Sequence, residues 1–317
     1  MSAVTPEALL WNGMRGALVT RVLAIMADLH VADALAGGPR SVEDLSRENG
    51  ADADTLHRLL RALASDGIFA EQAPGVFRNT ETSALLAGDG GWRDFAHLFG
   101  GVWLRTVAGL DASGATTFRR LFGTDFWPWL ADHPDERAAF DRAMEQGTES
   151  RLERLARLEW RGDETVVDVG GGNGSLLVEL QRLHPGIRGV VYDLPETVRS
   201  EDAFGDRISF VEGSFFDRVP PGDVYVLSTI LHDWDDEGAA AILRTVRAAS
   251  SPETRLIVLD GVIAPGNDPD GTKWLDLLML ATLGGRERSE REWRALLAAG
   301  GFEPVSLADG LIEARCR

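Results

Sequence analysis

The feature that most constrains this chain is a series of glycines directly after a short apolar segment. The stretch reads Thr-Val-Val-Asp-Val-Gly-Gly-Gly-Asn-Gly, with Asp168, Gly170, Gly172 and Gly174 at alternate positions. The apolar part predicts a buried strand, and residues 175–182 predict a helix immediately after the glycines. Bare backbone between a strand and a helix N-terminus favours the binding of a nucleotide-like ligand. A glycine-rich turn that binds no ligand is the alternative.

From residue 164 onward, short apolar segments alternate with helical patterns. The apolar segments lie at 165–169, 188–192, 208–211, 223–228 and 255–260. Such alternation predicts a parallel β-sheet with helices on both faces, which is an α/β fold. At 302–316 the pattern predicts two short strands that form a hairpin around Asp309 and Gly310 and close the sheet.

The first part of the chain predicts a mainly helical domain. Apolar residues recur at helical spacing from Leu18 to Leu29, a short helix is capped by Ser41, and a further helix covers 53–66. Two short strands are then expected across the Pro74-Gly75 turn. The order helix, turn, helix and hairpin is the winged-helix pattern.

We place this winged-helix domain at residues 1–91 and the second domain at residues 92–317. The stretch 92–158 is again helical and rich in large apolar side chains. We expect it to be a connector whose helices form one wall of a substrate pocket.

Composition limits the partners and the setting. The net charge of −18 disfavours nucleic acid or an anionic membrane surface as the main partner. The single cysteine, Cys316, excludes an internal disulfide framework and a metal site built from cysteines, and it fits a reducing compartment. Because Arg15, Arg21 and Asp28 interrupt the first apolar helix, we expect neither a membrane span nor a signal peptide. We therefore expect a cytoplasmic protein.

The glycine spacing separates two kinds of cofactor. A dinucleotide-binding loop requires Gly-x-Gly-x-x-Gly, but here the sixth position falls on Ser175 or Leu176. The observed Asp-x-Gly-x-Gly-x-Gly is typical of enzymes that bind S-adenosylmethionine (SAM). Asp193 ends the next predicted strand, where a carboxylate can accept both hydroxyl groups of a ribose. The alternative for Asp193 is a cap on the helix that follows.

A second set of candidates follows the later strands. His232 is the one histidine of six that falls at the carboxyl ends of the predicted strands within a charged cluster. A neutral imidazole there can accept a proton from a hydroxyl group near neutral pH. Asp260, at the end of the fifth apolar segment, and Glu287, before the last helix, can orient the imidazole and stabilise its protonated form. Capping of a helix that begins at Asp235 is the alternative role of His232.

Together these features resemble the SAM-dependent small-molecule O-methyltransferases typified by plant caffeate enzymes and bacterial polyketide-tailoring enzymes. The likeness covers nearly the whole chain and includes the glycine loop. It also rests on Tyr-Asp-Leu-Pro at 192–195, Leu-His-Asp-Trp-Asp-Asp at 231–236 and Gly-Gly-Arg-Glu-Arg at 284–288. The resemblance implies a Rossmann-like class I methyltransferase sheet, a winged-helix dimerisation domain, a homodimer, SAM as cofactor and no metal.

The resemblance also implies roles for single residues. His232 is expected to be the general base, flanked by Asp260 and Glu287. The expected cofactor-binding residues are Asp168, Gly170, Gly172, Gly174, Asp193, Ser214, Phe215 and Ser228. Two of these depart from the family pattern: Ser214 stands where an acidic residue is usual, and Ser228 stands where plant members have a lysine.

The implied reaction is an in-line transfer of a methyl group to a hydroxyl of an aromatic small molecule, such as a polyketide or other secondary metabolite. The expected pocket residues are Phe126, Trp127, Phe140, Met144, Asp233, Trp274 and Met279. Taken singly, the large apolar residues among them are more often part of a core. Two alternatives stay open: C-methylation, hydroxylation or decarboxylation on the same fold, and a winged-helix DNA-binding regulator, for which the sequence offers no basic stripe.

Overall fold

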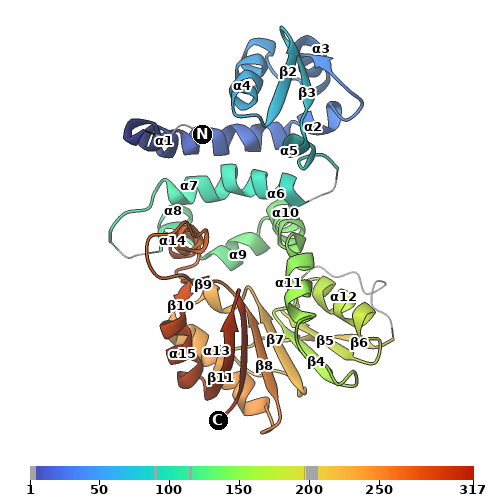
Figure 1. Ribbon diagram of the computed structural model, residues 1–317, viewed down its shortest axis with the longest axis vertical. Helices are drawn as coiled ribbons and strands as arrows, with labels where there is room; N and C mark the ends of the chain where they lie inside the picture. Colours follow the sequence, from blue (N-terminus) through green and yellow to red (C-terminus); the bar gives the residue numbers. More distant parts are fainter. Residues whose placement is uncertain (1–4, 89–90, 114–115, 196, 198–205) are drawn as a thin grey trace. The chain divides into compact units, whose positions relative to one another are not determined.

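The structure is a computed structural model, and it describes residues 5–88, 91–113, 116–195, 197 and 206–317 (Figure 1). The chain divides into two compact units. Met1–Gly109 and Asp132–Gln146 form the first, which we call the helical unit. Leu110–Ala131 and Gly147–Arg317 form the second, which we call the sheet unit.

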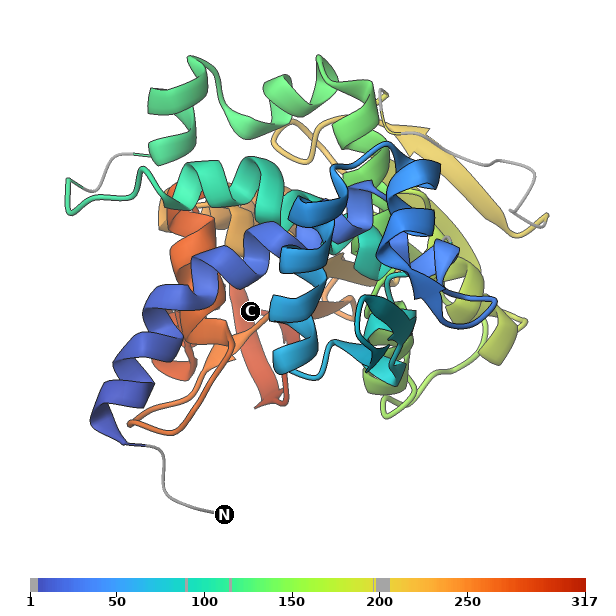
Figure 2. The same cartoon turned by 90° about the horizontal axis from the view of Figure 1, so that it is seen from above.

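The helical unit combines a long first helix with a small three-stranded sheet. Its elements are α1 (Pro6–Asp28), α2 (Val31–Ala34), β1 (Arg40–Ser41), α3 (Val42–Asn49), α4 (Ala53–Ser65), β2 (Phe69–Ala73), β3 (Val76–Asn79), α5 (Glu81–Ala84), α6 (Gly91–Leu98), the π-helical turn η1 (Phe99–Trp103), α7 (Leu104–Val107) and α10 (Pro134–Glu145). The sheet has the order β1-β3-β2 and is antiparallel, as the predicted hairpin requires. Within this unit α1 lies alongside α6 (Figure 2).

Local signals in the sequence explain where these helices begin. The side chain of Ser41 accepts a hydrogen bond from the backbone N–H of Asp44, and Asp52 does the same for Thr55, so both act as N-caps. The apolar faces of α3 and α4 then pack with the hairpin into one core, which contains Leu45, Leu56, Leu60, Phe69 and Phe77. The predicted helix–turn–helix–hairpin order is confirmed.

The sheet unit contains the remaining helices and strands. They are α8 (Thr117–Phe122), α9 (Phe126–Ala131), α11 (Thr148–Leu155), β4 (Thr165–Val169), α12 (Ser175–Leu183), β5 (Arg188–Asp193), β6 (Ile208–Glu212), β7 (Val224–Ser228), the 3-10 turn η3 (Leu231–Asp233), α13 (Asp236–Ala249), β8 (Arg255–Leu259), β9 (Val262–Ile263), α14 (Thr272–Thr282), β10 (Arg288–Ser289), α15 (Glu290–Ala299), β11 (Phe302–Ala308) and β12 (Leu311–Cys316).

Seven of these strands form one sheet in the order β11-β12-β8-β7-β4-β5-β6. The strands β6, β5, β4, β7 and β8 are parallel, and the hairpin of β11 and β12 joins β8 in antiparallel orientation. The predicted apolar segments and the predicted hairpin are therefore confirmed. Strand order reverses between β4 and β7, and the crevice at such a switch point is where open α/β sheets bind their ligands.

Both faces of the sheet are buried. Neighbouring residues alternate between two cores: Val167 and Tyr225 face one, whereas Val166 and Val226 face the other. The first core includes residues of α13 and α15, and the second includes residues of α11 and α12, as the positions of these helices in Figure 1 suggest. This packing fixes the carboxyl ends of the parallel strands as one continuous edge. In the described part of the chain, no helix has the length and apolar character needed to cross a membrane.

Candidate active site

The loop between β4 and α12 owes its glycines to its backbone conformation. The φ angles of Gly170, Gly172 and Gly174 are 75°, 57° and 81°, in the left-handed region that favours glycine. Gly170 is also restricted by space, because a Cβ atom there would overlap the side chain of Ile230. Gly174 is the N-cap residue of α12 and offers no side-chain acceptor to the first turn. The N–H groups of Gly170, Gly172 and Gly174 donate within the protein, to Tyr192 O, Asp193 Oδ2 and Gly171 O. The bare backbone of the loop therefore allows close approach of a ligand rather than offering a row of free donors.

Asp193 ends β5 and joins this glycine loop to the next segment. Its Oδ2 accepts a hydrogen bond from the N–H of Gly172 at 2.8 Å. Its Oδ1 accepts hydrogen bonds from the N–H of Leu194 at 2.7 Å and the hydroxyl of Thr197 at 2.9 Å. The carboxylate thus does cap the chain that follows it, and it also holds the glycine loop in place.

Two buried polar atoms at the ends of neighbouring strands have no hydrogen-bond partner among the described residues. They are Oδ1 of Asp168 in β4 and Oγ of Ser228 at the end of β7. Asp168 lies beneath the loop, since a Cβ atom on Gly171 would be 2.8 Å from its Cγ. Burial raises the pKa of Asp168 to about 7, with Arg151 acting in the opposite direction. Buried polar atoms are normally satisfied, so these two and the bare loop backbone fit a polar cofactor.

The segment after β6 brings an aromatic ring to the glycine loop. The ring of Phe215 lies 3.7 Å from the place of a Cβ atom on Gly170, and it also packs against the core. The side chain of Ser214 accepts a hydrogen bond from the N–H of Phe216 at 3.2 Å. The structure therefore brings Phe215 to the loop and uses Ser214 to stabilise the turn next to it.

His232 lies in the turn η3, just beyond β7, and is surrounded by acidic groups. Its Nδ1 is 2.6 Å from Oε1 of Glu287 and 3.9 Å from Oδ1 of Asp260. Its Nε2 is 3.4 Å from Oδ1 of Asp233. These four residues, which we call the base cluster, are all buried. The helix-capping alternative for His232 is wrong, because Asp235 caps α13 by accepting a hydrogen bond from the N–H of Gly238.

Burial and charge act against each other in the base cluster. Burial alone lowers the pKa of His232, but the carboxylates of Asp260, Glu287 and Asp233 outweigh it and raise this pKa to about 10. Burial raises the pKa of Asp233 and of Asp260 to about 7, and His232 opposes both shifts. The carboxylates of the cluster therefore stabilise a proton on the imidazole at neutral pH.

The seven expected pocket residues fall into different places. Phe140 and Met144 lie on α10 of the helical unit, and the other five belong to the sheet unit. Asp233 is part of the base cluster, and Phe126 and Met279 are buried. Trp127 contacts Phe126 with ring centroids 5.3 Å apart, whereas Trp274 on α14 is 76% exposed. A shared pocket for these residues stays a prediction.

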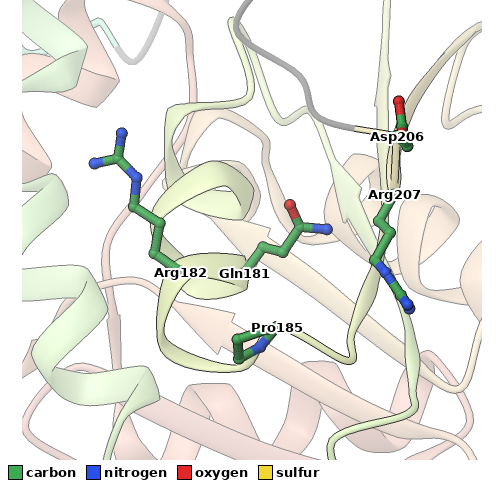
Figure 3. Close-up of a pocket in the computed structure, with 5 residues that line it drawn as sticks. All are labelled: Gln181, Arg182, Pro185, Asp206 and Arg207. Atoms are coloured by element: carbon green, nitrogen blue, oxygen red, sulfur yellow. The ribbon is translucent and has the colours of Figure 1, made fainter.

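A surface pocket of about 380 Å³ lies elsewhere on the sheet unit (Figure 3). The residues that line it lie in the last turn of α12, just after this helix or just before β6: Gln181, Arg182, Pro185, Asp206 and Arg207. This is the amino-terminal edge of the sheet, opposite the glycine loop and the base cluster. The pocket is therefore separate from the candidate active site.

Sequence reasoning missed Arg288, which closes the Gly-Gly-Arg-Glu-Arg motif and is fully buried. It also missed Gly285, where a Cβ atom would overlap the backbone of His232 and Asp233. The sequence shows Gly285 and Arg288 in the same motif as Glu287. It does not show that both contact the segment around His232, which lies more than 50 positions earlier.

The sheet order, the glycine loop at the switch point and the acidic residue that ends β5 define the class I methyltransferase fold. Residues 105–303 match the O-methyltransferase domain family, and residues 11–89 match the O-methyltransferase dimerisation domain. The chain therefore belongs to the O-methyltransferase family, whose methyl donor is SAM. The predicted family, fold class and cofactor are confirmed.

Characterised relatives cover almost the whole chain. It is 36% identical to the phenazine O-methyltransferase PhzM of Lysobacter antibioticus, over 99% of this chain and 97% of that protein. It is 36% identical to the 2,7-dihydroxy-5-methyl-1-naphthoate 7-O-methyltransferase of Streptomyces carzinostaticus, over 88% and 87%. The solved structure of NcsB1 from neocarzinostatin biosynthesis, with SAM and 2-hydroxy-5-methyl naphthoic acid, is similar with a TM-score of 0.82 and 32% identity, covering 95% of this chain and 96% of that one.

Proposed function

We propose that this enzyme methylates a hydroxyl group of an aromatic secondary metabolite, with His232 as the general base. The observation that carries the proposal is the 2.6 Å contact between His232 Nδ1 and Glu287, at the same sheet edge as the glycine loop. The named relatives act on phenazines and hydroxylated naphthoates, which supports an aromatic acceptor. A polyketide or another polycyclic phenol is our first choice.

The glycine loop and its neighbours are the proposed cofactor site. The backbone of residues 170–174, the carboxylates of Asp168 and Asp193, and the hydroxyl of Ser228 offer polar contacts, and Phe215 offers an aromatic face. We assign the ribose to Asp193, because it ends the strand next to β4 and already orients the loop. Ser214 is proposed to lie near the adenine. When bound, SAM supplies a methyl group on a positively charged sulfonium centre.

The base cluster is proposed to remove the proton of the acceptor hydroxyl. The carboxylates keep His232 protonated at neutral pH, so it acts as a base only after Nε2 has passed its proton to Asp233, whose Oδ1 lies 3.4 Å away. Because Glu287 occupies Nδ1, Nε2 is then the nitrogen that accepts the proton of the hydroxyl group. Asp260 supports the imidazolium form and also accepts a hydrogen bond from the N–H of Leu231 at 3.2 Å, next to His232 in the chain. General base catalysis of this kind contributes on the order of 10²–10⁴-fold to the rate.

We further propose that the enzyme is a homodimer and that α1 contributes to its interface. Five large apolar residues of α1 are each 61–70% exposed: Leu9, Leu10, Trp11, Met14 and Leu18. An apolar surface of this kind on a helix marks an interaction site, and the matched dimerisation domain begins at residue 11. A monomer at micromolar concentration in light scattering would contradict this proposal.

The functional division into a dimerisation domain of residues 1–91 and a methyltransferase domain of residues 92–317 also stays a proposal. The two matched domains, at 11–89 and 105–303, support it. The compact units divide the chain differently, because 92–109 and 132–146 both belong to the helical unit.

The decisive experiment supplies the purified enzyme with SAM and a panel of hydroxylated naphthoates, phenazines and other polycyclic phenols. Mass spectrometry should find S-adenosylhomocysteine (SAH) and a product heavier by one methylene group. NMR of that product should place the new methyl group on oxygen. A methyl group on carbon, or loss of a carboxyl group, would instead favour the alternative reactions.

His232→Ala tests the base within the same assay. It should lose about 10²–10⁴-fold in kcat and keep its affinity for SAH in calorimetry. His184→Ala is the matched control, since His184 follows α12 at the other edge of the sheet. Near-normal turnover by His232→Ala would remove His232 from the mechanism.

A further inference from the structure

Arg288 directly follows Glu287 and has no exposed surface. Its guanidinium group contacts the segment that carries His232. Nη1 donates a hydrogen bond to the carbonyl of Leu231, and Nη2 donates one to the carbonyl of Trp234, both at 2.9 Å. Nε donates to Oδ1 of Asp236, also at 2.9 Å. One side chain thus holds the backbone on both sides of His232.

The segment 231–234 depends on such contacts because it belongs to no long helix or strand. The turn η3 is three residues long, and Trp234 after it is extended. The carbonyl of His232 itself accepts a hydrogen bond from the N–H of Arg286 at 2.8 Å. Residues 286–288 therefore bind the carbonyl groups of residues 231, 232 and 234, which satisfies acceptors that regular secondary structure would otherwise pair.

Arg288 is itself held in one position. Its guanidinium lies 5.4 Å from the ring centroid of Trp293 on α15. The indole N–H of Trp293 donates a hydrogen bond to the carbonyl of Gly261, the residue after Asp260, at 2.9 Å. Arg288 therefore links the three chain segments that supply the base cluster.

We propose that Arg288 is a positioning residue for methyl transfer, which fixes the backbone around His232 so that Nδ1 stays on Glu287 and Nε2 stays directed toward the acceptor. This inference rests on the proposed base role of His232. The planar fork of arginine can reach two carbonyls and a carboxylate at once, which the single ammonium group of lysine cannot. A small misplacement of a reacting group lowers the rate by about 10²-fold.

Arg288→Lys tests the proposal, because it keeps the charge and removes the fork. We expect kcat to fall by about 10–100-fold, and the affinity for SAH in calorimetry to stay within about threefold of the wild type. We also expect the titration midpoint of the His232 imidazole, followed by NMR on histidine-labelled protein, to fall by about half a pH unit or more, because the contact with Glu287 loosens. The His232→Ala spectrum assigns the signal.

Arg294→Lys is the matched control. Arg294 lies on the neighbouring helix α15 and pairs with Glu290 at the surface. This variant should match the wild type in kcat, SAH affinity and the His232 titration. An Arg288→Lys enzyme with wild-type kcat and wild-type titration would overturn the proposal.

Asp236→Asn provides the test if Arg288→Lys does not fold. Asp236 has a side chain that is 59% exposed; its Oδ1 accepts a hydrogen bond from Nε of Arg288, and its Oδ2 accepts one from Nη1 of Arg286 at 3.1 Å. We expect the same downward shift of the His232 titration at a smaller size, and no shift would overturn the proposal. The titration does not depend on methyl transfer. Failure of the base role would therefore appear as normal turnover by His232→Ala, and failure of the positioning role would appear as an unchanged His232 titration.

Discussion

The glycine loop and the base cluster lie at the same edge of one sheet, yet they are built in opposite ways. The loop is continuous in sequence and consists mostly of glycine, with three glycines at positive φ. The base cluster gathers side chains from three distant segments, so that His232 and Glu287 are 55 positions apart. The comparison teaches that this enzyme makes its cofactor site from local backbone geometry and its base from tertiary structure.

The two regions also respond to different disturbances. The loop is sensitive to added volume, because the place of a Cβ atom on Gly170 is taken by Ile230. The base cluster is sensitive to lost charge, because three buried carboxyl groups surround one imidazole. Variants in the first region should change cofactor affinity, and variants in the second should change kcat.

Glu287→Gln should give the largest effect on this comparison. The amide keeps the shape of the side chain but no longer stabilises a proton on His232. We expect kcat to fall by about 10²-fold or more while the affinity for SAH in calorimetry stays unchanged. Glu290→Gln, on the exposed start of α15, is the control. An equal loss of SAH affinity and kcat would break the separation of the two regions.

Gly170→Ala should act on the other side of the comparison. The added methyl group meets Ile230, and the φ angle of 75° is strained for alanine. We expect the affinity for SAH, measured by calorimetry, to fall by about 10–100-fold. Gly172→Ala is a matched control, since its φ is 57° but no atom lies within 4 Å of its Cβ position. Equal losses in both variants would show that backbone strain alone matters.

Asp193→Asn should weaken SAH binding by about tenfold, the value of one hydrogen bond to a charged group. The kcat at saturating SAM should change little, because the base cluster is untouched. Asp163→Asn, whose side chain is 82% exposed in the same unit, serves as the control. An unchanged dissociation constant would contradict the assignment of the ribose to Asp193.

Asp168→Asn should bear least on the comparison, because it acts on stability and its pH dependence. Burial raises the pKa of Asp168 from 3.8 to about 7. Between these values the folded protein binds a proton that the unfolded chain does not, so this group makes stability fall as pH rises through that window. The ligand-free variant should therefore lose less stability than the wild type between pH 4 and pH 8. The shift of about three pH units limits this difference to about 4 kcal/mol.

Chemical unfolding at a series of pH values provides this measurement. Asp163→Asn again gives the baseline for removal of an exposed charge. Parallel stability curves for the wild type and Asp168→Asn would show that the buried carboxyl has an ordinary pKa.

Much of the sheet unit could be predicted because buried parallel strands appear as uninterrupted apolar runs. The glycine loop was equally accessible, since its φ angles require glycine at fixed positions. His232, Asp260 and Glu287 could be named because each follows a strand or precedes a helix at the carboxyl edge. The sequence does not reveal which carboxylate lies nearer to the imidazole. It is Glu287, rather than Asp260, that makes the 2.6 Å contact with Nδ1 of His232.

The remaining features depend on long-range packing. Arg288 gave only a local signal, a charge beside Glu287, whereas its partners lie more than 50 positions earlier. The aromatic residues of the expected pocket illustrate the same difficulty. Phe126 is buried and Trp274 is exposed, although the two are equally apolar in the sequence. Composition identifies such side chains but does not decide what they contact.

The 55-position separation of His232 from Glu287 also implies an order of assembly on the ribosome. The glycine loop and Asp193 emerge first, and the hydrogen bonds of Asp193 join residues between 172 and 197. His232 emerges later, and the carboxylate of Glu287 that contacts its Nδ1 follows 55 positions further on. The growing chain therefore contains the glycine loop and Asp193 well before it contains the last carboxylate of the base cluster.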